Sequence, residues 1–190
     1  MTPSPKINAV PGQILCCHPA NPNPTVSRIE ADAMLTTDGR LTLRYRIFAQ
    51  PRDILLPPPL PPGVGENLWQ HTCCEAFIAA VNRPEYREFN FSPSGQSAAY
   101  RFTDYRQRDT GFSPSIHPQV SLHCLNNQIV LDAILDKNLL PSGLKLEIGL
   151  SCIIEATDRR KSYWALRHCA AQADFHQRQS FTLTLNTTPP

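Results

Sequence analysis

The sequence predicts an all-β fold, an antiparallel β-sandwich or jelly roll of about nine to eleven short strands. Apolar and polar residues alternate over many short segments, as they do in strands that bury one face. Proline breaks helix interiors, so the 19 prolines argue against a helical bundle. In addition, no long segment repeats its apolar residues with the period of a helix. The 190 residues suit a single domain over 1–190, and we expect loose ends at 1–13 and 187–190.

Two hairpins are the clearest local features. In the first, apolar residues alternate with polar ones over 26–35 and again over 41–47, and Asp38-Gly39 supplies the tight turn between them. In the second, strands at 119–125 and 128–136 meet at Asn126-Asn127, and asparagine tolerates the left-handed backbone of such turns. Both patterns predict antiparallel pairs with one face in water.

The stretch Leu68–Tyr105 contains three further strands, expected at 72–81, 86–92 and 97–103. The first of them is apolar on both faces, which is typical of a central strand covered on both sides. Outside this stretch we expect an edge strand at 14–18, one helical turn within 137–143, and strands at 144–154, 162–168 and 181–185.

A proline-rich loop at 49–65 includes the run PRDILLPPPLPPG. Such a run adopts extended polyproline II structure, which is also the conformation in which peptide ligands bind SH3-type domains. A folded domain more commonly uses it as a stiff connection between sheets, and we favour that interpretation. The alternative makes the chain a protein-interaction or structural module.

Charge and cysteine content limit the functional classes. The net charge of +2 is too small and too scattered to predict a nucleic acid or an anionic membrane as partner. The N-terminal residues lack the apolar core of a signal peptide, so we expect a cytoplasmic protein with reduced thiols. The adjacent pairs Cys16-Cys17 and Cys73-Cys74 do not have zinc-finger spacing.

No catalytic signature is present in the sequence. SPSGQS differs from the nucleophile elbow of hydrolases, and Cys73 and Cys74 beside His71 are better explained as core residues of a strand. Among six histidines, the only ligand-like spacing is Asp174-Phe175-His176, which alone is a weak metal signal. We predict no enzyme activity, metal or cofactor, and note that calcium held by backbone carbonyls leaves no trace in a sequence.

Polar residues on one face of the central strands form the candidate binding site. Glu75 lies in an otherwise apolar strand, where an unpaired carboxylate would cost several kcal/mol. Glu88 and Asn90 share a face of the next strand, and Arg101 lies on the third. If the three strands are neighbours, these groups together suit hydroxyl-bearing ligands. The alternative is an ordinary solvated sheet face with a Glu–Arg pair.

The two tryptophans, Trp69 and Trp164, are candidates for stacking against a ligand ring. Trp69 precedes the central strand at the edge of the sheet, and Trp164 lies in SYWALRH. An indole at the mouth of a pocket can cover the apolar face of a sugar while polar neighbours bind its hydroxyls. Alternatively, Trp164 belongs to the core and Trp69 closes one end of the sandwich.

LWQHTCCEAF, EFNFSPSGQSAAYRF, SYWALRH and ADFH resemble segments of bacterial DOMON-like domain proteins, which are related to carbohydrate-binding module family 9 and to haem- or sugar-binding DOMON domains. The resemblance covers about residues 10–186. It implies a jelly-roll or immunoglobulin-like sandwich that binds a ligand without catalysis. In family 9 modules two tryptophans clamp a terminal sugar and a glutamate six residues after the first binds its hydroxyls. Trp69, Glu75 and Trp164 match that pattern.

The chain also departs from this pattern. Family 9 modules are usually secreted appendages of hydrolases, whereas for this chain we expect neither a signal peptide nor an attached enzyme. The haem-binding branch uses an axial methionine with a histidine, and the one internal methionine, Met34, lies on the less apolar face of its strand. We therefore expect a carbohydrate or a similar polar molecule as ligand, with Trp69, Glu75, Asn90, Arg101 and Trp164 as its site, and we disfavour haem.

Overall fold

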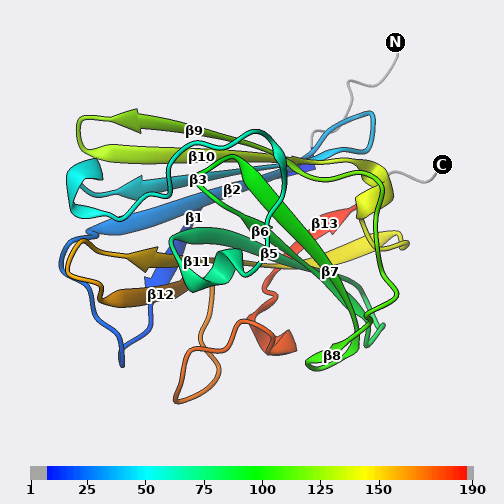
Figure 1. The fold of residues 1–190 in the computed structure, drawn as a ribbon. Coiled ribbons are helices and arrows are strands. Elements are labelled where there is room, and N and C mark those ends of the chain that lie inside the picture. The colour runs from blue at the N-terminus through cyan, green and yellow to red at the C-terminus, as the bar shows by residue number, and fades with distance from the viewer. Residues whose placement is uncertain (1–7, 188–190) are drawn as a thin grey trace, which may run out of the picture.

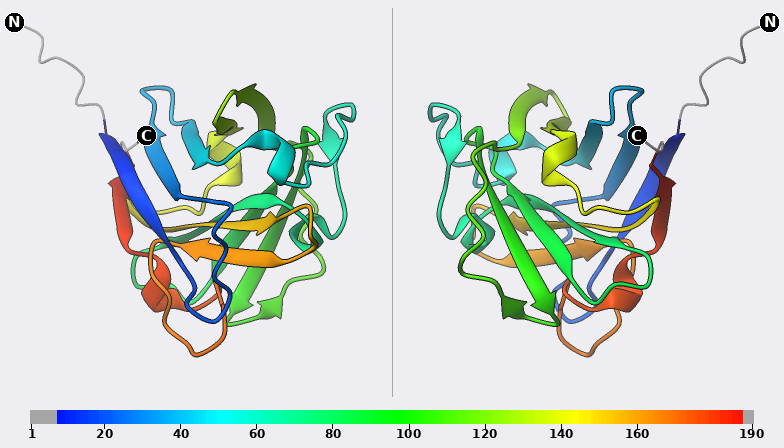
Figure 2. Two further views of the ribbon diagram at one scale, coloured as in Figure 1. Left: turned by 90° about the vertical axis from the view of Figure 1, so that its left-hand side faces the viewer. Right: turned by 90° about the vertical axis from the view of Figure 1, so that its right-hand side faces the viewer.

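The structure, a computed structural model, describes residues 8–187, and this part of the chain is all-β with 13 strands and four 3-10 turns. The strands form two stacked layers of one curled sheet (Figures 1 and 2). The upper layer has the order β1 (Asn8–Cys17), β2 (Arg28–Leu35), β3 (Leu41–Phe48), β10 (Gln128–Leu135) and β9 (Gln119–Leu125).

The lower layer carries the candidate functional site. Its strand order is β4 (Gly63–Val64), β7 (Gln96–Asp104), β6 (Tyr86–Phe91), β5 (Cys73–Ala80), β11 (Lys145–Glu155) and β12 (Lys161–Ala165). Two strands lie off this path, since β13 (Leu183–Asn186) pairs with β11 and β8 (Gln107–Arg108) pairs with β7. The 3-10 turns are Pro51–Asp53, Leu68–Gln70, Lys137–Leu139 and Arg178–Ser180.

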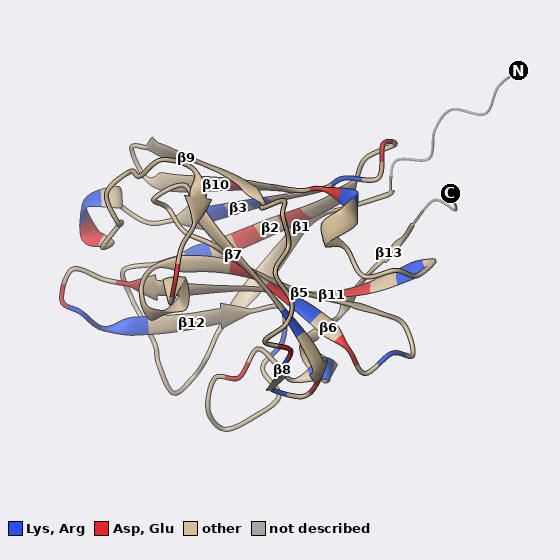
Figure 3. Ribbon diagram, turned by 45° about the vertical axis from the view of Figure 1, so that its right-hand side comes forward, with Lys and Arg blue, Asp and Glu red and all other residues tan. Residues whose placement is uncertain are grey.

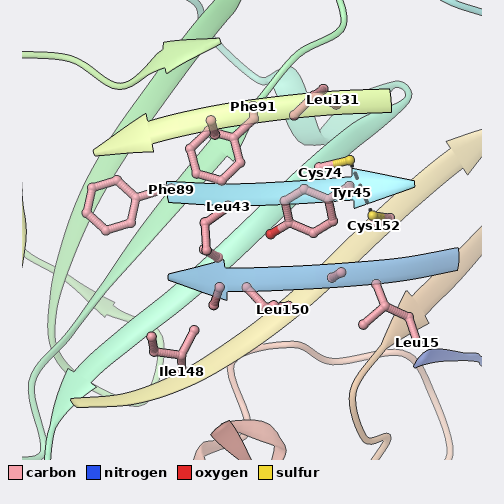
Figure 4. Close-up of a cluster of buried hydrophobic side chains, with 14 of the residues drawn as sticks. Leu15, Leu43, Tyr45, Cys74, Phe89, Phe91, Leu131, Ile148, Leu150 and Cys152 are labelled. Carbon is pink, nitrogen blue, oxygen red and sulfur yellow. Dashed lines mark hydrogen bonds between the residues drawn. The ribbon is translucent and has the colours of Figure 1, made fainter. Parts of the chain in front are cut away.

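The main core fills the space between the layers. Leu43 and Tyr45 of β3 face Cys74 of β5, Phe91 of β6 and Leu150 of β11, and all five are buried (Figure 4). The Tyr45 hydroxyl donates a hydrogen bond of 2.7 Å to the main-chain oxygen of Glu75. This bond satisfies a buried polar group and ties the two layers together at the strand that carries the candidate site.

Both predicted hairpins are confirmed. In the first, β2 pairs with β3 from Arg28 opposite Phe48 to Leu35 opposite Leu41, so its apolar residues enter the core. On the solvent face, acidic residues of β2 lie beside basic residues of β3 (Figure 3), and Arg46 contacts Asp32 at 2.6 Å. In the second, β9 pairs with β10 across the turn at 126–127.

The three strands predicted between 72 and 103 are also confirmed as neighbours, in the order β5, β6 and β7. Every residue of β5 is buried, as its apolar pattern on both faces predicts. Its lower face is covered by a second apolar cluster, in which Phe77 of β5 packs with Phe175 and Phe181 of the chain that crosses beneath the layer (Figure 2).

The strand count and the expectation of purely antiparallel pairing were wrong. Residues 8–187 form 13 strands rather than nine to eleven, and β4 pairs in parallel with β7. Strands β4 and β8 have two residues each, too few for an alternating pattern to indicate them. The pairing of β4 and a hydrogen bond of 2.8 Å from Leu60 N to Ser94 O anchor the proline-rich loop to the lower layer.

The N-terminal predictions also need correction. Residues 8–13 belong to β1, whereas 1–7 lie outside the described residues, as do 188–190 at the other end. β1 is no edge strand, because Asn8–Leu15 pairs with β2 and Cys16 and Cys17 pair with β12, so it joins the two layers. Thr187 is held by a 2.9 Å bond from its amide to Leu144 O. None of the helices in the described part is long and apolar enough to cross a membrane.

Candidate functional site

A cavity of about 420 Å³ opens on the outer face of the lower layer, away from the main core. The sheet supplies its floor, the chain after β12 supplies one wall, and the turn before β5 and the β7–β8 turn form its rim. Its polar and aromatic lining includes Trp69, Glu75, Glu88, Tyr100, Arg106, Arg108, Lys161, Tyr163 and His176.

Strand register brings the floor residues together. Glu75 of β5 lies opposite Asn90 of β6 and Ser151 of β11, and Glu88 lies opposite Phe77 and Tyr100 on either side. Residues directly opposite in paired strands point to the same face, so all of these side chains project outward. The even spacing of Glu88 and Asn90 in the sequence places both on this face, as predicted.

Glu75 is the most unusual residue of the floor. It is 2% exposed, and the only hydrogen bond to its carboxyl group from the described residues is a long one of 3.5 Å from Ser151 Oγ. Burial raises the pKa of Glu75 well above its usual value, and the nearby Glu88 raises it further. A carboxyl in this environment favours its protonated form when the cavity holds no cation.

Glu88 is better satisfied than Glu75. Asn90 Nδ2 donates a hydrogen bond of 2.8 Å to its Oε1 atom, and Asn90 is itself fully buried behind it. Burial raises the pKa of Glu88, whereas the bond from Asn90 and the charges of Arg106 and Arg108 act against that rise. The two carboxyl groups of the floor therefore differ in their partners, because within residues 8–187 the charges of Arg106 and Arg108 act on Glu88 and no cationic side chain acts on Glu75 in the same way.

A histidine–tyrosine pair forms the wall beside Glu88. The Arg106 amide donates to the Tyr86 hydroxyl at 3.0 Å, and Tyr86 lies 2.8 Å from His176 Nδ1. With the Tyr86 proton directed at Nδ1, the imidazole carries its own proton on Nε2, 3.6 Å from Glu88 Oε2. Burial lowers the pKa of His176 to about 4 and raises that of Tyr86 to about 12.

The basic residues of the rim already have partners. Arg106 forms an ion pair of 2.8 Å with Asp174. Burial opposes ionisation of Asp174, but bonds from Tyr105, Gln177 and Arg106 outweigh it and lower its pKa to about 2. The Arg108 guanidinium lies 4.2 Å from the centre of the Tyr100 ring, a cation–π contact. Lys161 donates from Nζ to the main-chain oxygen of Gln70.

Of the five predicted site residues, the structure brings Trp69 and Glu75 to the cavity. Trp69 lies in the 3-10 turn before β5 and is 47% exposed at the rim. Asn90 lies behind the cavity and contacts Glu88 rather than open space. Glu88 itself was recognised as part of the polar face by strand parity, and it lines the cavity.

Arg101 and Trp164 need correction because they point away from the cavity. Arg101 lies opposite Arg87 in the register of β6 and β7, on the other face from Glu88, and it pairs with Asp109. Trp164 is 6% exposed within the core between the layers, where its Nε1 donates to Ser162 Oγ at 2.9 Å. Its neighbour Tyr163 lines the cavity instead.

Sequence reasoning did not find Arg106, Arg108, Lys161 and His176 as cavity residues. Arg106 and Arg108 belong to a polar segment that reads as an ordinary loop, and no local pattern indicates that it folds back beside β7. His176 had been noted in the Asp174-Phe175-His176 sequence as a weak metal signal. In the structure Asp174 contacts Arg106 and His176 contacts Tyr86. Residues 8–187 contain no group of three or more acidic, histidine or cysteine side chains that could hold a metal ion.

The cysteines near His71 are core residues, as predicted. Cys73 and Cys74 are buried, and Cys74 Sγ lies 3.3 Å from Cys152 Sγ on the neighbouring strand (Figure 4). His71 turns away and contacts Glu155 at 2.8 Å. No thiol–imidazole pair of the kind used in nucleophilic catalysis forms at this point of the fold.

Comparison with known proteins identifies the fold. No family model matches the sequence, and the search of curated proteins finds no match. A candidate carbohydrate-binding protein from Bacteroides uniformis superimposes with a TM-score of 0.66 at 14% identity, over 95% of this chain and 86% of that one. A carbohydrate-binding module of family 9 from Caldicellulosiruptor kristjanssonii, solved with glucose, gives 0.51 at 13% identity, over 97% and 85%. The chain therefore shares its β-sandwich fold with these two proteins.

Proposed function

We propose that this chain is a non-catalytic module that binds a carbohydrate or a similar polar small molecule in the cavity on the lower layer. The observation that carries the proposal is the combination of an exposed indole, Trp69, at the rim with the two buried carboxyl groups of Glu75 and Glu88 at the floor. Aromatic faces stack on the C–H faces of sugar rings, and carboxyl groups bind their hydroxyls.

The size of the cavity supports this proposal. Its volume of about 420 Å³ lies within the range of about 300–1,000 Å³ typical of small-molecule sites. Tyr100, Tyr163 and Phe175 add aromatic surface, so the lining combines apolar walls with a few polar groups. That composition is what a ring with one apolar face and several hydroxyls requires.

The similar proteins support the same class of ligand. One of them is described as a candidate carbohydrate-binding protein, and the family 9 module holds glucose. The resemblance of several sequence segments to DOMON-like and family 9 proteins is a further reason to propose a distant relation to them. In this proposal Tyr163 takes the place beside the ligand that the resemblance assigned to Trp164.

A fluorescence titration tests the proposal. Trp69 is exposed at the rim whereas Trp164 is buried, so sugar binding should change the Trp69 emission and leave the Trp164 emission almost constant. We expect mono- or disaccharides to shift the spectrum and Trp69→Ala to weaken binding at least tenfold, as measured by calorimetry. The control is Leu125→Ala on β9, which removes an exposed apolar side chain from the upper layer.

Two outcomes would overturn the proposal. One is that no sugar gives either a fluorescence or a calorimetric signal. The other is that Trp69→Ala and Leu125→Ala bind every sugar as tightly as the unaltered chain does, since the rim would then have no part in binding.

A further inference from the structure

We infer that the ligand carries a protonated amine, as an amino sugar does, and that this amine forms an ion pair with Glu75 at the floor of the cavity. The inference rests on the proposed function for its sugar component and adds a charged group to it. It follows from one feature of the cavity, a buried carboxyl group that lines it and has no cation of the protein beside it.

Glu75 is aimed into the cavity and lacks a strong partner. Its side chain lines the cavity at 2% exposure, and Ser151 Oγ at 3.5 Å is the only group of the described residues that donates to it. A buried carboxyl group without strong hydrogen bonds is costly to the fold, and such groups commonly serve a ligand. Glu88, in contrast, is held by Asn90 at 2.8 Å.

The charged and titratable groups around Glu75 do not supply the missing cation. Arg106 is paired with Asp174, and Arg108 lies over Tyr100 on the side of Glu88. Lys161 donates to a main-chain oxygen of the 3-10 turn. The remaining titratable groups that line the cavity are Glu88, Tyr100, Tyr163 and His176, and Cys73, on the strand of Glu75 itself, is buried against Asn90.

None of those remaining groups supplies a positive charge to Glu75. The imidazole of His176 is neutral, because burial lowers its pKa to about 4 and its Nδ1 atom is occupied by Tyr86. The second carboxyl group, Glu88, makes the surroundings of Glu75 more negative. The electrostatics of the floor therefore favour a ligand that brings one positive charge.

The aromatic lining favours an amine in the same way. Trp69 and Tyr163 line the cavity, and the negative faces of aromatic rings attract cations. A carboxylate that pairs with an ammonium inside an aromatic cavity is well desolvated, which strengthens the attraction between the charges. A neutral sugar would find the same hydroxyl partners without this gain.

Binding of an ammonium group has a measurable proton balance. In the free chain, burial and the nearby Glu88 raise the pKa of Glu75, which favours the protonated carboxyl group. The ion pair requires the carboxylate, so one proton leaves Glu75 for the solvent for each ammonium that binds. A neutral sugar leaves Glu75 protonated and releases none.

Calorimetry with three matched sugars tests the inference. Glucosamine, N-acetylglucosamine and glucose are titrated at a slightly acidic pH, each in two buffers that differ in ionisation enthalpy. We expect glucosamine to bind at least tenfold more tightly than the two neutral sugars and to release close to one proton. Glu75→Gln should abolish both the preference for glucosamine and the proton release.

The possible failures separate the two proposals. If glucose binds and glucosamine binds no more tightly, or binds without releasing a proton, the amine inference is overturned and the sugar proposal stands. Cyclohexylamine, an amine without hydroxyls, tests whether the cavity binds an amine even when it binds no sugar. If it binds with proton release that Glu75→Gln removes while no sugar binds, the amine site stands and the sugar proposal falls. If none of these molecules binds, both are overturned. The proton count is measured on the unaltered chain and needs no variant to fold.

Discussion

Acid should destabilise this fold through one buried histidine, His176. Its imidazole packs between the rings of Phe77 and Phe102, with both ring centres 5.0 Å away, and its Nδ1 accepts from Tyr86. Protonation would place a charge in this apolar cluster and replace the acceptor at Nδ1 with a second donor. Because burial lowers its pKa in the folded chain, His176 contributes stability that is present above its unfolded pKa and is lost as the pH falls.

The magnitude follows from the two pKa values. Burial lowers the pKa from 6.5 to about 4, and the side chain is 14% exposed, so solvent screening is small. At about 1.4 kcal/mol for each pKa unit, the full effect is roughly 3 kcal/mol. Between about pH 7.5 and about pH 4.5 the loss is about 2.5 kcal/mol, most of it below about pH 6.

The assay compares the unaltered chain with His176→Asn by urea unfolding at a series of pH values. Asparagine keeps an acceptor for Tyr86 but does not titrate, and the packing it loses is the same at every pH. Glu75 and Glu88 act in the opposite direction, because their raised pKa values give stability that is lost as the pH rises. The contribution of Glu75 is common to both proteins and cancels in the difference, whereas that of Glu88, whose Oε2 lies 3.6 Å from His176 Nε2, cancels only in part.

The unaltered chain should therefore lose about 2.5 kcal/mol more than His176→Asn on acidification. The matched control is His123→Asn on the exposed strand β9, which should follow the unaltered chain. Parallel pH profiles for the unaltered chain and His176→Asn would refute the reasoning, since they would mean that His176 is not held neutral by its surroundings.

Two further changes test the packing around the site. Tyr45→Phe removes the buried hydroxyl that donates at 2.7 Å to the Glu75 main chain, and should cost about 1–3 kcal/mol in urea unfolding with an unchanged slope, because the oxygen is left without its donor. Equal midpoints for the two proteins would count against this bond. Gly149→Ala would place a methyl group 2.9 Å from Phe181 Cδ1, so it should cost about 1–3 kcal/mol, and Phe181→Leu in the same chain should recover part of that loss. A single substitution without effect on the melting temperature would show that Phe181 does not press on this strand.

Much of the fold was predictable because its strands bury one face and leave the other in water. The alternation in 28–35 and 41–48 identifies both strands, and the Asp-Gly turn identifies their pairing. Strand β1 was largely missed because Gly12 interrupts its pattern at a register shift between Val10 and Gln13. Its last two residues, Cys16 and Cys17, pair with β12, far along the chain, and no local pattern carries that information.

The site was predictable only as far as the alternation of side chains along a strand allows, because odd and even positions (the strand parity) point to opposite faces of the sheet. Parity placed Glu75, Glu88 and Asn90 on one face, and this holds because β5 and β6 pair without a bulge. Arg101 was assigned to the same face, but parity within a strand does not fix the register between strands. Trp164 has Tyr163 as its neighbour, and the choice of which ring enters the core depends on the layer that packs above β12.

The origin of the cavity lies in the apolar outer face of the lower layer. A sandwich ordinarily leaves that face in water, yet here Phe77 and Tyr86 project outward from adjacent strands. Phe175 and Phe181, from the chain after β12, cover these side chains. Ordering that segment costs conformational entropy, and the main core is complete without it. Glu75 lines the cavity that this cover helps to enclose, so a buried carboxyl group, rather than an apolar side chain, faces the cavity from β5. A stable fold could have placed alanine or serine at this position, and we infer that binding, more than stability, accounts for the glutamate.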